Sequence, residues 1–440
     1  MPEQKPGRLH IAIVGYGTAG QAAAILLSRD GHRVEVFERS PSLGPVGAGV
    51  LLQPVGLRVL WEMGLLEIAL DHGRRVDRLF GETPAGLPVM DMRYANLDPR
   101  IYGLGMQRGA LFSILAAAVT DEVQVHCARR IVSCSEDGRR IEDDAGCSHG
   151  PFDLVLGADG STSLLRVSAG PPKLDRPYPW GALWCLLDES DWAFPHELRQ
   201  RYVRARKMIG LLPVGTRPGD PTPRLSFFWS LPTARFEAWS SAGLAPWLDE
   251  IRALWPEAHG LLDGIADAAQ LSRASYRDAI PRRWQRNRLA LIGDAAHAMS
   301  PQLGQGVNMA LLDALALRDA LREASSVEAA LAGYEQIRRR HVRAYQFWSR
   351  WLTPLFQSDL DTIGALRDLA FHRLGRLWGM RGLMLRVLSG TQLGWLGKVV
   401  LPEPFLAVLE HAGRADPAGS RLDSSVVSNR RENHGQFPAS

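Results

Sequence analysis

A short apolar run followed by closely spaced glycines, near the start of the chain, constrains this sequence more than any other feature. Ile11 to Val14 resemble a strand, Gly15, Gly17 and Gly20 follow in GxGxxG spacing, and the alanine-rich stretch 21–28 is expected to be helical. In such a strand-turn-helix unit the first glycine allows the turn, the second lets a pyrophosphate approach the backbone, and the third lets helix and strand pack closely. The helix N-terminus then faces the anion.

The next strand-like run completes a βαβ unit. It extends from His32 to Phe37 and ends at Glu38, eighteen residues after Gly20. A carboxylate at this point accepts hydrogen bonds from a ribose diol. The sequence therefore predicts a dinucleotide-binding unit, against the alternative of a glycine-rich turn in a plain α/β domain. The unit by itself leaves open whether the dinucleotide is FAD or NAD(P).

The same segment has no Asp, Glu, Lys or Arg from Leu9 to Ser28, which resembles a signal peptide or a membrane span. Its glycines argue against both, and we expect no transmembrane segment. The 440 residues are 46% hydrophobic and 22% charged, which is typical of globular proteins and excludes a mostly disordered or polytopic membrane chain. This length predicts two or three domains.

Cysteine and arginine usage restrict the location and the partners. The four cysteines form no CxxC pair and no His lies at ligand spacing, which predicts a reducing, cytoplasmic location, no disulfide framework and no metal site. Only four of the 51 basic residues are lysines, so the net charge of +4 is carried almost wholly by arginine. Arginine binds phosphates and carboxylates well, although a bias over a whole chain is more typical of genomic composition. We expect anionic small molecules, and no nucleic acid, as partners.

Two later segments also place an acidic residue at the end of a strand. Residues 153–166 read DLVLGADGSTSLLR, with Asp159 at the strand end, and residues 289–314 read LALIGDAAHAMSPQLGQGVNMALLDA, with Asp294 in the same place before a glycine-rich loop and a long helix. Open α/β sheets bind ligands at the carboxyl edge of their strands, so both aspartates are expected there. For Asp159 the alternative of a helix N-cap stays open.

These three motifs, in this order and separation, resemble those of the class A flavoprotein monooxygenases, the family of para-hydroxybenzoate and salicylate hydroxylases. The resemblance covers residues 8 to 350. It implies an α/β fold with a Rossmann-like FAD-binding domain, an inserted mixed β-sheet substrate domain and a helical C-terminal region. We expect the FAD-binding domain at 1–72, 104–175 and 276–335, the substrate domain at 73–103 and 176–275, the helical region at 336–412, and a disordered tail at 413–440.

The resemblance also implies which residues hold FAD. Asp294 would bind the ribityl chain, and the helix start after it would direct N–H groups at the pyrimidine end of the isoalloxazine, where reduced flavin is negative. Glu38 would hold the adenosine ribose and Arg108 the pyrophosphate, with Arg166 as a second candidate. The predicted set is Gly15, Gly17, Thr18, Ala19, Gly20, Glu38, Arg39, Gly49, Val50, Arg108, Asp159, Asp294, Gly304, Gln305, Gly306, Val307 and Asn308.

Because no second nucleotide fold follows, NADH or NADPH is expected to dock briefly, reduce FAD and leave, as in the family. Strand-like runs such as WGALWCLLD and RLSFFWSLP are expected to form a sheet over the flavin with the substrate between them. Candidate substrate residues are Trp184, Leu212 and Trp229, each with core packing as the alternative. Pro301 is the catalytic candidate, through its backbone carbonyl, whereas His297 is expected to serve structure and cofactor packing.

The resemblance implies an FAD-dependent monooxygenase that uses NAD(P)H and O2 to hydroxylate an aromatic or other electron-rich small molecule through a flavin C4a-hydroperoxide. Three alternatives stay open. One is a flavin-dependent halogenase, although the WxWxIP segment of those enzymes is missing from this sequence. The others are an oxidase or reductase without oxygen transfer, and a non-catalytic FAD protein that binds a membrane or a partner.

The last third of the chain is expected to be helical, with helices at 308–322 and 327–351. We interpret the basic run from Arg338 to Arg343 as a solvated face rather than a nucleic-acid contact. The Arg-, Leu- and Trp-rich segment from Leu374 to Leu401 favours packing on the FAD-binding domain. An oligomer face, a cavity lid or a peripheral membrane contact are its alternatives. We expect a monomer or homodimer.

Overall fold

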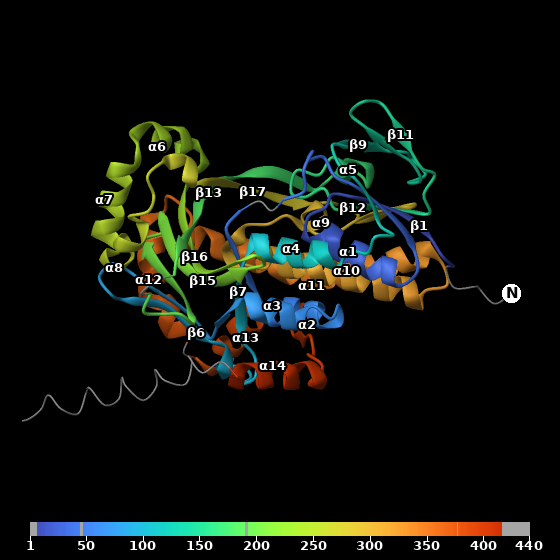
Figure 1. Cartoon of the computed structure of the whole chain (residues 1–440). Helices are drawn as coiled ribbons and strands as arrows, with labels where there is room; N and C mark the ends of the chain where they lie inside the picture. Colours follow the sequence, from blue (N-terminus) through green and yellow to red (C-terminus); the bar gives the residue numbers. More distant parts are fainter. Residues whose placement is uncertain (1–6, 45–46, 190–191, 376, 416–440) are drawn as a thin grey trace, which may run out of the picture.

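The computed structural model describes residues 7–44, 47–189, 192–375 and 377–415 (Figure 1). A six-stranded sheet with its covering helices forms one half of the molecule, and a seven-stranded sheet forms the other. The long helix α11 (Val327–Phe356) runs from the first half to the second.

The six-stranded sheet forms around the predicted βαβ unit. Its order is β18-β19-β12-β1-β2-β8, and every neighbouring pair is parallel except β18 with β19. Helix α1 packs on β1 and β2 and contacts α10 and α4. Successive residues of β1 and β12 are buried, so these central strands are covered on both faces. The elements are β1 (His10–Val14), α1 (Thr18–Arg29), β2 (Arg33–Phe37), α4 (Arg108–Ala118), β8 (Gln124–His126), β12 (Leu154–Gly157), α5 (Leu165–Ser168), β18 (Gln285–Arg286), β19 (Leu289–Leu291), α9 (Asp294–His297) and α10 (Gly306–Glu323).

The seven-stranded sheet joins two segments that lie far apart in the sequence. Its order is β17-β13-β16-β15-β14-β5-β6, and the parallel pairing of β14 with β5 connects the later segment to the earlier one. Both parts of the predicted substrate domain thus contribute to one sheet. The strands are β5 (Arg78–Glu82), β6 (Pro88–Arg93), β13 (Leu174–Asp188), β14 (Glu197–Val203), β15 (Lys207–Arg217), β16 (Asp220–Pro232) and β17 (Ser272–Ile280).

The two faces of this sheet contact different parts of the molecule, because successive side chains of a strand point to opposite sides. Leu183 and Trp229 lie on one face and pack with Trp247 of helix α7. Their neighbours Trp184 and Phe228 lie on the other face, in a cluster that includes Phe356 at the end of α11. Three helices cover the face that carries Leu183 and Trp229: α6 (Phe236–Ala242), α7 (Leu244–Leu254) and α8 (Pro256–His259).

A three-stranded sheet of β3, β7 and β4 connects the halves. Strand β7 packs directly on β15, and a Cβ added to Gly105 would lie 1.9 Å from the carbonyl oxygen of Pro213, so only glycine fits there. The remaining early elements are β3 (Gly49–Leu52), α2 (Pro54–Glu62), α3 (Leu66–His72), β4 (Arg74–Val76), β7 (Gly103–Gln107) and the small sheet of β9 (Ile131–Cys134), β10 (Ile141–Asp143) and β11 (Ser148–His149).

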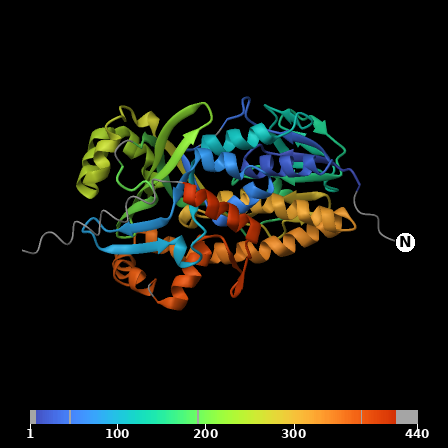
Figure 2. The same ribbon diagram turned by 60° about the horizontal axis from the view of Figure 1, so that its bottom comes forward.

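Helices α13 and α14 of the C-terminal region lie at the bottom of Figure 1, which comes forward in Figure 2, and α12 lies beside the seven-stranded sheet. Helix α11 passes unbroken through residues 335 and 336, where the sequence predicted a domain boundary. The predicted tail begins inside a helix at 413–415, and its residues 416–440 lie outside the described part. No described helix is long and apolar enough to cross a membrane. The elements are α12 (Asp361–Leu374), α13 (Trp378–Leu388), β20 (Gln392–Leu393), β21 (Gly397–Lys398) and α14 (Glu403–Ala415).

The basic run on α11 is not solvated throughout, which corrects the sequence-based interpretation. Arg338 and His341 are each only 3% exposed. The Arg338 Nε atom donates to Oδ1 of the buried Asp313 at 2.7 Å, and the other oxygen of Asp313 lies 2.6 Å from Nε2 of His297. A buried carboxylate between two basic groups explains why Arg338 leaves solvent. Although burial by itself raises the pKa of Asp313, His297 and Arg338 outweigh it and lower that pKa.

His341 extends this network and is held neutral by its partners. Its Nδ1 lies 2.6 Å from Nη1 of Arg338, which can only donate, and its Nε2 lies 2.9 Å from the carbonyl oxygen of Gly390. These partners require an accepting Nδ1 and a donating Nε2. Burial, and then the charge of Arg338, lower the pKa of His341 to about 3.

We expect acid to destabilise the fold through His341. Between the ordinary pKa of 6.5 and about 3, the unfolded chain holds a proton that the folded protein does not. The free energy of unfolding therefore falls as pH is lowered, by up to about 1.4 kcal/mol per pH unit. Urea unfolding of the wild type and His341→Asn at pH 7.5 and pH 4.5 checks this. The acid-induced loss should be about 2 kcal/mol smaller in the variant; an equal loss in both proteins would contradict the assignment.

Candidate functional site

The groups predicted to bind the cofactor stand at one edge of the six-stranded sheet. Strands β19, β12, β1 and β2 lie side by side and run parallel, so their carboxyl ends meet. In that order the strands are followed by Asp294, Asp159, Gly15 and Glu38. Residues separated by more than 250 positions therefore belong to a single site.

The glycine turn and the start of α1 form an open anion site. Gly15 has a φ of +105°, and Cβ atoms added to Gly15 and Gly20 would lie 2.4 Å and 2.0 Å from backbone oxygens, whereas one on Gly17 would meet open space. Helix α1 has no side-chain cap and no acidic residue in its first turn. Its first N–H groups, from Thr18 to Gly20, are thus left for an external anion.

Glu38 is fixed beside this turn. Its Oε2 accepts a hydrogen bond from the backbone N–H of Tyr16 at 2.7 Å, and its Oε1 accepts one from the N–H of Ser40 at 2.9 Å. The carboxylate is therefore oriented before any ligand arrives, and each oxygen keeps a lone pair for a diol. Arg39, the next residue, is exposed and forms no ion pair with a described residue.

Asp159 is not the N-cap residue of α5, but it binds the backbone at the start of that helix and keeps one oxygen for another partner. Its Oδ2 accepts hydrogen bonds from the N–H groups of Leu164 and Leu165, at 2.8 Å and 3.3 Å, at the start of α5. Its Oδ1 is buried and has no partner among the described residues. A buried oxygen without a donor is costly, so this atom fits a site that a ligand completes.

Asp294 is the first residue of α9, and its side chain lies near the start of α10. Its side chain is exposed, and a Cβ added to Gly306 would lie 3.8 Å from its Oδ1. Gly304 adopts the left-handed conformation just before α10, with φ of +61°, and that helix has neither a side-chain cap nor an acidic residue in its first turn. A carboxylate and a row of unpaired N–H groups therefore face the same space.

The side chains of Asn308 and Gln305 bind protein rather than that space. Asn308 accepts from the N–H of Gln53 at 2.8 Å and donates to the carbonyl of Leu51 at 3.2 Å, which ties β3 to α10. Gln305 donates to the carbonyl of Leu388 at 2.6 Å. Only the backbone groups of these two residues are available to a ligand.

Arg108 is the first residue of α4 and has no ion-pair partner among the described residues. It is exposed, yet the protein atoms around it displace enough water to lower its pKa, while the acidic groups Asp294 and Tyr276 act in the opposite direction. A Cβ added to Gly47 would lie 2.8 Å from its Cδ. Arg108 thus lies near both Asp294 at the strand edge and Tyr276 of the seven-stranded sheet, without a direct ion pair to a described residue.

Arg166, the second candidate for the pyrophosphate, binds protein groups instead. It is fully buried, donates from Nε to the carbonyl of Ala295 at 2.9 Å and from Nη2 to that of Asp294 at 3.0 Å, and pairs with Asp175 at 2.8 Å. This residue connects the two aspartate motifs from behind. It does not reach the open side where a phosphate would lie.

Trp184 and Leu212 lie on the face of the seven-stranded sheet that carries Tyr276 near Arg108, whereas Trp229 lies on the opposite face. Trp184 donates from Nε1 to the hydroxyl oxygen of Tyr276 at 3.2 Å, and Leu212 packs with the core that includes β7. Trp229, by contrast, is 2% exposed in the cluster against α7, on the opposite face. The structure therefore does not bring Trp229 to the site.

Tyr276 is the residue that the sequence analysis missed. Burial raises its pKa to about 12, despite the hydrogen bond from Trp184 and the charge of Arg108, so its hydroxyl stays protonated and can donate. It lies where the pairing of β13 with β17 shifts register, between Pro177 and Gly181. Such a shift leaves no mark in the sequence beyond a tyrosine in a strand-like run.

These groups suit a flavin dinucleotide. Two uncapped helix N-termini, the free guanidinium of Arg108 and the carboxylates of Glu38 and Asp294 are the donors and acceptors that a pyrophosphate, a ribose and a ribityl chain require. Within the described ranges, no three His, Cys, Asp or Glu side chains are arranged to hold a metal ion.

Comparisons with known proteins agree with this geometry. A family model for the FAD binding domain matches residues 8–349. The chain is 31% identical to 6-methylpretetramide 4-monooxygenase of Streptomyces rimosus over 410 residues, which cover 87% of this chain and 92% of that protein. It is 30% identical to FAD-dependent urate hydroxylase of Klebsiella oxytoca over 344 residues, covering 75% and 86%.

Solved structures share the fold. The tetrameric form of 2-methyl-3-hydroxypyridine-5-carboxylic acid oxygenase superposes with a TM-score of 0.71 at 24% identity, covering 89% of this chain and 100% of that one. Klebsiella pneumoniae HpxO, complexed with FAD and uric acid, gives 0.71 at 24% identity, covering 88% and 98%. The chain therefore belongs to the class A FAD-dependent aromatic monooxygenases.

Proposed function

We propose that this enzyme hydroxylates an aromatic small molecule with NADH or NADPH and O2. One oxygen atom enters the substrate, the other leaves as water, and the nicotinamide supplies the two electrons. The observation that carries the proposal is the convergence of two uncapped helix N-termini, Asp294 and Arg108 at one strand edge that faces the seven-stranded sheet. Bound FAD supplies hydride acceptance and oxygen activation there.

The adenosine half of FAD is assigned to the β1–β2 side of the edge. Glu38, already oriented by two backbone N–H groups, accepts from the ribose hydroxyls. The first turn of α1 and the guanidinium of Arg108 would hold the pyrophosphate, since both are positive and neither has an ion pair with a described residue. The unpartnered Oδ1 of Asp159 accepts a donor from the ligand or from water bound with it.

The flavin half is assigned to the α10 side. Asp294 accepts from the ribityl hydroxyls, and the N–H groups of Gly306 and Val307 stabilise negative charge at the pyrimidine end of the ring. Gly49 and Val50 of β3 lie beside it, where a Cβ added to Gly49 would come within 2.5 Å of the Ser226 side chain. Strand β3 therefore packs closely on the seven-stranded sheet at this point.

The substrate is assigned to the space between the flavin and the sheet. Tyr276 can donate its hydroxyl proton to an oxygen of the substrate, because that proton has no acceptor among the described residues. The ring of Trp184 offers an aromatic wall, and Leu212 lies on the same face. The carbonyl of Pro301, in the turn before α10, stays a proposed contact to the reacting edge.

Relatives support the substrate class without choosing a substrate. They are named as enzymes acting on urate, 6-methylpretetramide and 6-hydroxynicotinate. Three such different names agree with an aromatic ring as the common requirement. An oxidase or reductase would use the same cofactor site, so the fate of oxygen has to be measured.

Labelled oxygen decides between these reactions. We expect the purified protein to consume NADH or NADPH in the presence of O2, faster when an accepted aromatic compound is added, and to form a product with one atom of 18O from 18O2. Mass spectrometry of the product and a nicotinamide assay give the two quantities. Stimulated oxidation that yields only hydrogen peroxide, with no labelled product across a panel of phenols and hydroxylated heterocycles, would contradict the proposal.

We expect Tyr276→Phe to lower kcat/KM about tenfold, because the loss of one hydrogen bond to the substrate costs about 1.4 kcal/mol. Trp229→Phe is the matched control: it removes aromatic bulk from the opposite face of the same sheet and should leave kcat/KM unchanged. Since the pKa of Tyr276 is about 12, the wild type should also lose no activity through this group up to pH 10. Steady-state kinetics would refute the assignment if Trp229→Phe had the larger effect.

A further inference from the structure

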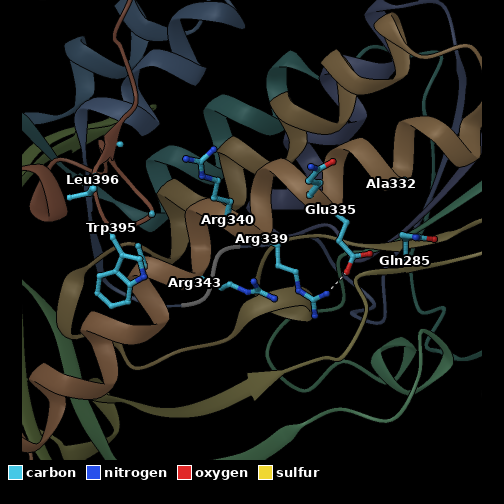
Figure 3. Close-up of a pocket in the computed structure, with 12 residues that line it drawn as sticks. Gln285, Ala332, Glu335, Arg339, Arg340, Arg343, Trp395 and Leu396 are labelled. Atoms are coloured by element: carbon cyan, nitrogen blue, oxygen red, sulfur yellow. Dashed lines mark hydrogen bonds and ion pairs between the residues drawn. The ribbon is translucent and has the colours of Figure 1, made fainter.

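A pocket of about 830 Å³ opens on the solvent side of α11 and shares no residue with the flavin site (Figure 3). One wall is α11, through Arg339, Arg340 and Arg343. The other is the turn between β20 and β21, through Trp395 and Leu396. Neither the proposed reaction nor the binding of FAD accounts for it.

The pocket carries positive charge that the protein does not neutralise. Arg339 pairs with Glu335 at 2.6 Å and also donates to the carbonyl of Pro281 at 2.9 Å. Arg340 and Arg343 are exposed and form no ion pair with any described residue. Figure 3 shows Arg343 between Arg339 and Trp395, with Arg340 on the same stretch of helix. Two guanidinium groups are thus free to bind an anion.

Large apolar side chains surround these arginines. Leu396 is 98% exposed, Trp395 is 65% exposed and Trp351 is 66% exposed. The ring centroid of Phe347 lies 4.6 Å from that of Trp395 and 6.0 Å from that of Trp351, so the three aromatic side chains contact one another in a row. We call the whole set the interfacial patch; its members are Arg340, Arg343, Phe347, Trp351, Trp395 and Leu396.

Helical spacing explains why the patch is contiguous. Its four α11 members follow one another at intervals of three, four and four residues, which places them in one stripe on the outer surface of that helix. The buried Arg338 and His341 lie on the other side. The β20–β21 turn then adds its two apolar side chains at the stripe, where a Cβ on Gly394 would be 3.7 Å from Nε of Arg340.

Exposed apolar side chains are frequent in the C-terminal part of the chain, to which Trp351, Trp395 and Leu396 of the patch belong. Ten of the seventeen exposed large hydrophobic side chains among the described residues lie between positions 351 and 400. Single exposed apolar residues are ordinary, but a contiguous group marks a surface that contacts something other than water. A partner of this surface must suit both the apolar side chains and the free arginines.

Charge complementarity selects the partner. A second copy placed on the patch by twofold symmetry would bring like charges together. A soluble nucleotide could use the arginines and one indole ring, but would leave Leu396 and Trp351 in water. The surface of an anionic bilayer satisfies all of them, because arginine binds lipid phosphate while tryptophan and leucine enter the interface.

We propose that the interfacial patch docks the enzyme on an anionic phospholipid bilayer, with a lipid phosphate between Arg340 and Arg343 and with Trp395 and Leu396 inserted at headgroup level. The free guanidinium groups supply the attraction to the headgroups. The fully exposed Leu396 at the end of the turn supplies apolar area that leaves water on docking. This binding is independent of the hydroxylation reaction.

Vesicle co-sedimentation of the FAD-loaded full chain tests the proposal. The protein should bind vesicles of phosphatidylcholine mixed with phosphatidylglycerol much more tightly than phosphatidylcholine alone, and added salt should weaken this binding. Arg340→Gln/Arg343→Gln and Trp395→Ser/Leu396→Ser should each lower the affinity at least about tenfold. The matched control is Arg130→Gln/Arg235→Gln, which removes two exposed arginines without ion pairs from elsewhere. It should bind like the wild type.

Three results would overturn the proposal. The first is equal binding to both kinds of vesicle, or equal losses in the patch and control variants. The second is the absence of vesicle binding together with arginine-dependent binding of inorganic phosphate or NADPH, which would make the pocket a site for a soluble anion. The third is a loss of dimers in Trp395→Ser/Leu396→Ser by light scattering without vesicle binding, which would make the patch a contact between copies. Unchanged flavin content in each variant shows that it folds.

Discussion

The parallel pairing of β19, β12, β1 and β2 determines where every other part of the flavin site can stand. Each strand ends at the same edge, so Asp294, Asp159, the glycine turn and Glu38 meet there although the chain between them is long. Two helices then begin at this edge without caps and leave their first N–H groups unpaired. An edge of this kind suits an elongated ligand that carries phosphate and a ring system that becomes negative on reduction.

A second layer of buried polar contacts keeps this edge in place. Arg166 joins the two aspartate motifs through their carbonyls, Asn308 ties α10 to β3, and Asp313 accepts from the N–H of Gly293 at 2.7 Å while it pairs with Arg338. None of these side chains is free to touch FAD. Their burial is costly unless every partner is present, so they couple the position of Asp294 to the packing of α11.

Most of the six-stranded sheet and its ligand-binding edge could be predicted from the sequence, because local signals mark them: an apolar run, a glycine turn and an acidic residue at a strand end. The prediction for Arg338 and His341 was wrong, because Arg338 pairs with Asp313 on another helix and His341 bonds to Arg338 and to the distant carbonyl of Gly390, whereas the charged run alone is typical of a solvated face. Trp229 was misplaced and Tyr276 was missed for another reason. Which face of a strand meets the flavin depends on pairing register and on bulges, and these follow from contacts between distant strands.

The central claim is that this edge holds a flavin dinucleotide along its whole length, and comparison of FAD with FMN tests it most directly. In the proposed arrangement Glu38 and the N-terminus of α1 would contact only the part of FAD that FMN lacks or carries as a single phosphate. Titration of the apoprotein, followed by quenching of flavin fluorescence, should give a Kd for FAD at least about a hundredfold lower than for FMN. Equal affinities for the two flavins would contradict the account.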